Sequence, residues 1–140
     1  MYPDSIVTEL SDFSREKLNS KDYPDYIHNF TLFECSSCKS SVFRLTLEHH
    51  TGSEECNFRG VIWGTCKACG YLMRLFTFTG NHRERQREER PECECGNRSF
   101  LSGQCERIEG EKGIPGFFDE GVIVGKCDEC GCKKSIVFYD

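Results

Sequence analysis

Four pairs of closely spaced cysteines constrain this chain more than any other feature of its sequence. Eight of the eleven cysteines fall into these pairs, which are Cys35 with Cys38, Cys66 with Cys69, Cys93 with Cys95, and Cys127 with Cys130. In a chain of 140 residues, two small halves bury little apolar surface each, so each half needs a cross-link to be stable. The cysteine pairs can supply that cross-link either as disulfides or as metal ligands.

The redox setting decides between disulfides and metal ligands. Residues 1–10 contain Asp4 and Glu9 and have neither the basic start nor the apolar run of a secretory signal. No stretch is apolar for long enough to cross a bilayer, so no membrane contact is expected. We therefore expect a cytoplasmic protein, or one of another reducing intracellular compartment, in which thiols stay reduced. An odd cysteine count would also leave one thiol unpaired in a complete disulfide scheme, which favours metal ligation.

The chain contains an internal repeat with a spacing of 61 residues. The segments 60–70 (GVIWGTCKACG) and 121–131 (GVIVGKCDECG) are identical at seven of eleven positions in one register. The upstream pairs also correspond, because Phe43 lies five residues after Cys38 and Phe100 lies five residues after Cys95. The sequence therefore predicts an N-terminal helix and connector at 1–28, a first unit at 29–80, a charged linker at 81–90 and a second unit at 91–140.

Each unit is predicted to consist of short strands around two cysteine turns. The turns are 27 residues apart in the first unit and 31 in the second, which leaves room for a strand out and a strand back. A strand is expected at 42–48, where Phe43, Leu45 and Leu47 alternate with polar residues, a pattern typical of a strand with one buried face. Further strands are expected at 31–33, 60–64 and 71–78, and a linker or short exposed helix at 81–90. An amphipathic helix is expected at 4–18, either packed on the strands or docked in a groove of a partner. His49 and His50 are expected in a polar loop.

The cysteine turns are suited to a tetrahedral metal ion. Two such turns that face each other present four thiolates at the geometry that zinc prefers. Gly70 and Gly131 follow the second turn of each unit, where a tight turn favours a backbone conformation that other residues avoid. The candidate ligands are Cys35, Cys38, Cys66 and Cys69 for one ion, and Cys93, Cys95, Cys127 and Cys130 for the other. The turn Cys93-x-Cys95 is one residue short, so this knuckle must be tighter or partly replaced. Cys56, Cys105 and Cys132 are expected to be small buried apolar side chains.

In this arrangement the chain resembles the zinc ribbon family, whose two knuckles look like Cys35-x-x-Cys38 and Cys66-x-x-Cys69-Gly70. The resemblance covers most of the first unit and, with a shortened knuckle, the second. It implies a small, metal-bound, mainly β fold of two tandem zinc-ribbon β-hairpin modules with two Zn²⁺ ions per chain, but it implies no particular activity. Rubredoxin also holds one iron between two Cys-x-x-Cys-Gly knuckles, so an iron-containing electron carrier stays an alternative.

Charge and composition favour a binding role over catalysis. The formal charge is −5 and the pI is near 5.4, which argues against a surface that is basic throughout and grips phosphate backbones. The sequence has no evident combination of nucleophile and base and no phosphate-binding loop. We therefore expect a non-enzymatic adaptor or accessory subunit that binds a protein partner.

Nucleic-acid binding in transcription or RNA processing is the alternative binding role. It would rest on the linker arginines Arg83, Arg85, Arg87 and Arg90. Glutamates lie between these arginines and cancel much of their charge. The large apolar residues near the knuckles, which would form either the core or a partner surface, are Trp63, Phe76, Phe78, Phe117 and Phe118.

Overall fold

The computed structural model describes residues 4–19, 26–54, 57–79, 84–109 and 117–140. Within these residues the chain forms one helix and eight strands, which confirms the predicted mainly β class with an N-terminal helix. They are α1 (Asp4–Lys17), β1 (Ile27–Leu32), β2 (Val42–His50), β3 (Gly60–Cys66), β4 (Leu72–Phe78), β5 (Arg85–Glu89), β6 (Ser99–Glu109), β7 (Phe117–Cys127) and β8 (Lys133–Tyr139). No helix in these ranges has the length and apolar character needed to cross a membrane.

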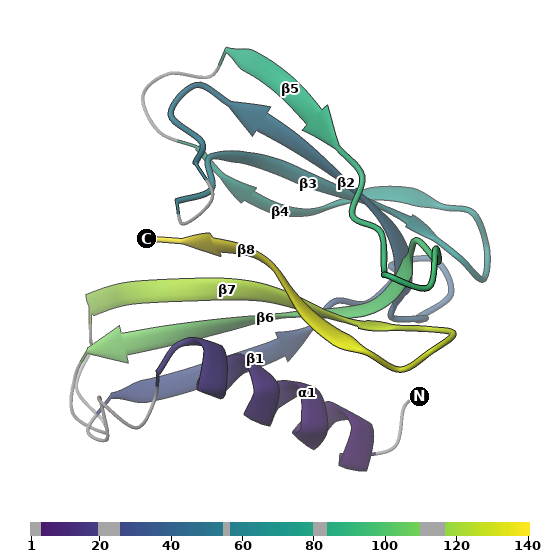
Figure 1. Cartoon of the computed structure of the whole chain (residues 1–140), viewed down its shortest axis with the longest axis horizontal. Coiled ribbons are helices and arrows are strands. Elements are labelled where there is room, and N and C mark those ends of the chain that lie inside the picture. The colour runs from purple at the N-terminus through teal and green to yellow at the C-terminus, as the bar shows by residue number, and fades with distance from the viewer. Residues whose placement is uncertain (1–3, 20–25, 55–56, 80–83, 110–116) are drawn as a thin grey trace.

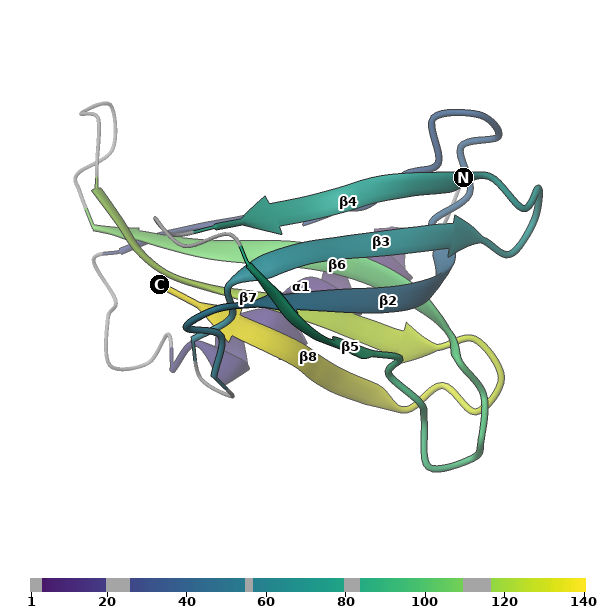
Figure 2. The ribbon, with the colours of Figure 1, turned by 90° about the horizontal axis from the view of Figure 1, so that it is seen from above.

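All eight strands belong to one antiparallel sheet that folds over on itself. The main path of the sheet is β4-β3-β2-β6-β7-β8, with β5 added beside β2 and β1 added beside β6. Figure 1 shows the two resulting layers, one containing β2, β3, β4 and β5 and the other containing β1, β6, β7 and β8. Figure 2 looks onto the first layer from outside. The layers are joined where β2 pairs with β6, so the two sequence units share one sheet.

The junction between the layers is built from equivalent residues of the internal repeat. Phe43 of β2 pairs with Phe100 of β6 in antiparallel register. Lys67 and Asp128, each of which follows the first cysteine of its second turn, form an ion pair across the same junction. Because equivalent residues meet in antiparallel orientation, an approximate two-fold axis relates the two units and passes between Phe43 and Phe100.

The strand that precedes the cysteines of each unit pairs with the other unit. β1 precedes the cysteines of the first unit but pairs with β6, from Ile27 opposite Ile108 to Leu32 opposite Gly103. β5 precedes the cysteines of the second unit but pairs with β2. Two exchanged strands therefore tie the units together on either side of the short β2–β6 junction.

The charged segment 81–90 differs from its predicted structure. We expected a linker or a short exposed helix, but residues 85–89 form strand β5, and residues 81–83 lie outside the described part of the chain. β6 covers the edge of β2 only from Val42 to Arg44. The backbone groups farther along β2 need other hydrogen-bond partners, and β5 provides them. Tertiary pairing thus overrides the local charge pattern.

Both histidines that were expected in a loop instead lie at the end of β2 and are buried. His49 forms hydrogen bonds through Nε2 to Glu89 Oε1 (2.8 Å) and through Nδ1 to Ser53 Oγ (2.7 Å). His50 forms one through Nε2 to Glu48 Oε2 (2.8 Å). The docking of β5 explains the difference, because it extends β2 past the predicted end of the strand and covers these side chains.

The main core lies between the two layers. Phe43, Leu45 and Leu47 are buried as their alternation predicts. They pack with aromatic and aliphatic residues of both layers, and the ring centroids of Phe76 and Tyr139 are 4.6 Å apart. Among the large apolar residues singled out in the sequence, Phe76 is buried, Phe78 and Trp63 are half-buried, and Phe118 is 40% exposed. The side chain of Phe117 lies outside the described residues.

A second core forms where α1 covers the outer face of the second layer (Figure 1). Leu10 and Leu18 pack there against Leu101, Val122 and Val124. The contact confirms that the predicted amphipathic helix packs on the strands. Cys105 is buried in the same cluster, and burial raises the pKa of its thiol to about 11, as expected of a small apolar side chain.

We expect the substitution Gly121→Ala to lower the free energy of unfolding by about 3 kcal/mol. Gly121 lies against the ring of Tyr139, and a Cβ there would lie 2.1 Å from Tyr139 Cζ. Denaturant unfolding measures the loss. Gly52→Ala is the control, because its Cβ meets nothing within 4 Å and only the positive φ of 88° opposes it, at about 1 kcal/mol. Equal losses for the two variants would contradict the close contact.

Candidate metal centres

The structure gathers the eight predicted cysteines into two groups of four. The Sγ atoms of Cys35, Cys38, Cys66 and Cys69 all lie within 4.8 Å of one another, and so do those of Cys93, Cys95, Cys127 and Cys130. Sulfur–sulfur distances across the turns are 3.6 Å for Cys35–Cys69, 3.5 Å for Cys38–Cys66, 3.3 Å for Cys93–Cys130 and 3.6 Å for Cys95–Cys127. A disulfide needs about 2.05 Å, whereas tetrahedral zinc with Zn–S bonds of about 2.3 Å places its sulfurs about 3.8 Å apart. The donor set and its spacing fit a tetrahedral metal ion.

Each group is half buried in the same way. In each turn the first cysteine is buried and the second is exposed. The buried residues, Cys35, Cys66, Cys93 and Cys127, belong to the core between the layers. A metal ion in either group would therefore join an exposed turn to the apolar core.

The second turn of each unit has the geometry that its glycine predicts. Gly70 has a φ of 78° and Gly131 a φ of 77°. The amide of Gly70 donates to the carbonyl oxygen of Cys66 (2.8 Å), and the amide of Gly131 donates to that of Cys127 (3.1 Å). These left-handed conformations strain other residues, so the glycine expectation is confirmed.

The shortened turn of the second unit keeps its shape with one residue fewer. In the first unit, Lys39 takes the left-handed conformation with a φ of 70°, and its amide donates to Cys35 O (2.8 Å). In the second unit, Gly96 has a φ of 91°, and its amide donates to Cys93 O (2.8 Å). The hydrogen bond that closes the turn thus joins residues three positions apart in the second unit and four positions apart in the first. Glycine allows the tighter bend.

Hydrogen bonds lower the pKa of the buried thiols of Cys35 and Cys66 in the first group and of Cys127 in the second. Burial disfavours the thiolate of Cys66, but the amides of Cys69 and Ala68 and the Cys38 thiol donate to it and lower its pKa to about 6. The pKa of Cys127 is also about 6, because the Cys130 amide and the Asn97 side chain outweigh the effect of burial. These preformed thiolates favour a cation at the centre of each group.

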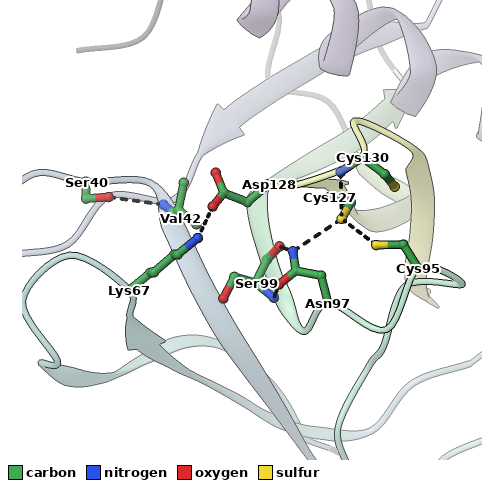
Figure 3. A network of polar contacts seen from close by, with 9 residues as sticks. All are labelled: Ser40, Val42, Lys67, Cys95, Asn97, Ser99, Cys127, Asp128 and Cys130. Atoms are coloured by element: carbon green, nitrogen blue, oxygen red, sulfur yellow. Dashed lines mark hydrogen bonds and ion pairs between the residues drawn. The ribbon is translucent and has the colours of Figure 1, made fainter.

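Asn97 supports the second group and was not identified from the sequence. Its Nδ2 donates to Cys127 Sγ (3.2 Å) and to the carbonyl oxygen of Ser99 (2.9 Å). Figure 3 shows Asn97 beside Cys127, with Cys95 and Cys130 on the other sides of the sulfur. Its position two residues after Cys95, in a turn that favours asparagine, is the signal that could have revealed it.

We expect Asn97→Ala to weaken zinc binding at the second group about tenfold, because it removes a hydrogen bond that orients a ligand. Ser40→Ala is the matched control, since Ser40 also lies two residues after the second cysteine of its first turn. Stepwise competition with a zinc chelator resolves the affinities of the two groups. Equal weakening by the two substitutions, or an effect of Asn97→Ala on the first group, would contradict this role.

The three remaining cysteines differ from one another. Cys105 is buried under α1, whereas Cys132 is exposed, so the prediction that Cys132 is buried is wrong. The Cys132 carbonyl accepts a hydrogen bond from the Cys127 amide (2.8 Å) and closes the turn, as the Tyr71 carbonyl does for Cys66 (2.9 Å). Both residues lie at the exposed exit of a turn, which explains their exposure. Cys56 lies outside the described residues.

The candidate phosphate-binding arginines are close to carboxylates. The shortest ion-pair distances are 2.7 Å for Arg85–Glu88, 3.8 Å for Arg87–Glu89 and 3.1 Å for Arg90–Glu88. Arg83 lies outside the described residues. The carboxylates cancel much of the positive charge along β5, as the interleaved sequence predicts.

The fold and these groups define a mainly β protein with two four-cysteine clusters that can hold metal ions. Comparison of the chain with models of known protein families, with curated proteins and with solved structures finds no match.

Proposed function

We propose that each cysteine group binds one Zn²⁺ ion, so that the protein is a tandem pair of zinc ribbons, and that it acts as a non-enzymatic adaptor or accessory subunit for a protein partner. The observation that carries the proposal is the convergence of four thiols within 4.8 Å at each of two symmetric places. Four thiolates at this spacing suit tetrahedral zinc.

A structural role for the metal follows from the number of ligands. A catalytic zinc site usually has three protein ligands and keeps one position open for water or substrate. Here the four cysteines of each group would complete the coordination of an ion. The metal would stabilise the two small units and would have no catalytic role. Iron suits the same ligands and is distinguished from zinc by its visible absorption.

The charge distribution supports a protein partner over nucleic acid. The chain has a net charge of −5, and the β5 arginines lie beside Glu88 and Glu89. A polyanion would meet a repulsive overall field and little free positive charge on this strand. A protein partner needs only a local complementary surface.

Affinity capture with and without nuclease treatment tests the binding role. The zinc-loaded chain serves as bait in a cell extract, and a variant with both Cys66→Ser and Cys127→Ser serves as the control. We expect a protein to be enriched at fixed stoichiometry by the zinc-loaded chain alone, and nuclease not to release it. Capture of RNA or DNA with no nuclease-resistant protein would favour the nucleic-acid alternative and contradict the proposal.

A further inference from the structure

The two layers of the sheet are related by the repeat, yet α1 covers only one of them. On the second layer, Val122 and Val124 of β7 are fully buried beneath α1. The equivalent residues of the first layer are Val61 and Trp63 of β3, and Trp63 is only half-buried. Figure 2 shows this outer face of β2, β3 and β4, over which no described helix lies, with α1 on the far side of the molecule. We call it the uncovered face.

The uncovered face contains a hollow next to exposed apolar residues. The hollow has a volume of about 300 Å³ and is lined by Thr46, Trp63, Leu72, Glu88 and Arg90. Leu72 is 59% exposed and its neighbour Tyr71 is 48% exposed. Tryptophan and tyrosine are enriched among the residues that contribute most to binding at protein interfaces.

Two arginines on this face have no ion-pair partner among the described residues. Arg74 pairs in strand register with Trp63, and Arg44 lies two residues before Thr46 on the same side of β2. The repeat places Leu101, which packs beneath α1, at the position equivalent to Arg44. The first unit therefore has a positive charge where the second has a helix-packing residue.

The contact between α1 and the second layer shows how a helix packs on the outer face of this sheet. The apolar side of α1 packs on β6 and β7. Its carboxylate Glu9 pairs with Lys126 at 2.9 Å and with Lys133 at 3.2 Å. A helix on the uncovered face would meet Trp63 and Leu72 with its apolar side, and Arg44 and Arg74 would attract its acidic residues.

We infer that the uncovered face binds an acidic amphipathic helix of a partner protein, in the place that corresponds to α1 on the other layer. This inference rests on the proposed adaptor role and specifies the partner. Apolar side chains of the helix enter the hollow at Trp63, and its carboxylates pair with Arg44 and Arg74. A single helix matches both features of the face, the hollow with its apolar residues Trp63 and Leu72 and the positive charge of Arg44 and Arg74.

Selection from a displayed library of randomised 15-residue amphipathic helices tests the inference with the zinc-loaded full chain. We expect enriched helices to place aspartate and glutamate beside the apolar stripe. Trp63→Val, which installs the residue found at the equivalent position 124, should weaken their binding about 30-fold. Arg74→Glu should weaken it about tenfold. Arg87→Glu is the matched control, because Arg87 lines a different hollow with His49 and Glu89, and should leave binding unchanged. Unaltered thermal midpoints confirm that the variants fold.

Three outcomes would overturn the inference. The first is that enriched helices bind equally well to the Trp63→Val and Arg74→Glu variants. The second is that the chain binds a 15-nucleotide single strand through Arg74. The third is that Trp63→Val dissociates a dimer of the chain. The adaptor proposal is tested separately on the same preparation, by its zinc content and by nuclease-resistant capture of a protein. These two measurements distinguish a wrong assignment of the uncovered face from a wrong adaptor proposal. Two zinc ions per chain, together with a captured partner whose binding does not depend on Trp63, would contradict only the assignment of the helix to the uncovered face.

Discussion

Removal of zinc is expected to unfold most of the protein. Structural zinc in small cysteine sites contributes about 10–16 kcal/mol of binding free energy, and the net stability of a domain is only about 5–15 kcal/mol. Cys35, Cys66, Cys93 and Cys127 are buried in the shared core. Loss of both ions would leave four unliganded thiols in each group and would remove a binding free energy at least as large as the net stability of the domain.

The unfolding is measured by circular dichroism and by the fluorescence of Trp63, the single tryptophan, during titration with a zinc chelator. We expect both signals to change together and to recover when zinc, but not magnesium, is added back. Magnesium prefers oxygen ligands and is the matched control. An unchanged spectrum and an unchanged melting temperature after complete removal of the metal would contradict a structural role.

Substitution of one buried ligand is expected to remove one zinc ion and to destabilise the chain strongly. Cys66→Ser and Cys127→Ser each replace a sulfur of one group. Serine is a poor zinc ligand, so each variant should bind one ion per chain instead of two. Its free energy of unfolding should fall by several kcal/mol, roughly the part of the metal-binding energy that the site no longer supplies.

Two other cysteines provide controls for this experiment. Cys105→Ala removes a buried thiol that belongs to neither group, and Cys132→Ser changes an exposed one. The first should cost about 1 kcal/mol as a small core cavity, and the second should cost almost nothing. Both variants should keep two ions. Loss of an ion from the Cys132 variant would show that this sulfur, and not one of the four, is a ligand.

Local patterns predicted β2, β3 and β4 of the first unit and the composition of the cysteine groups. The alternation of Phe43, Leu45 and Leu47 predicted a buried face because side-chain direction alternates along any strand. The positive φ of Gly70 and Gly131 followed from turn geometry that depends on a few residues. These features are local, so a single sequence contains their signal.

The pairing of strands that are far apart in the chain could not be predicted from the sequence. Nothing in the composition of residues 85–89 indicates a strand, because the unpaired edge of β2 creates it. The burial of His49 follows from the same pairing. The sequence suggested two consecutive modules, but the exchange of β1 and β5 depends on which free edges lie within reach after the junction at Phe43 and Phe100 has formed.

Metal content per chain, measured by native mass spectrometry together with the visible spectrum, is the decisive test of the zinc assignment. We expect two zinc ions per chain and no visible absorption, because zinc has a filled d shell. One ion per chain would mean that one of the two groups does not bind metal. No metal at all, or iron with strong visible absorption, would contradict the zinc assignment for both groups.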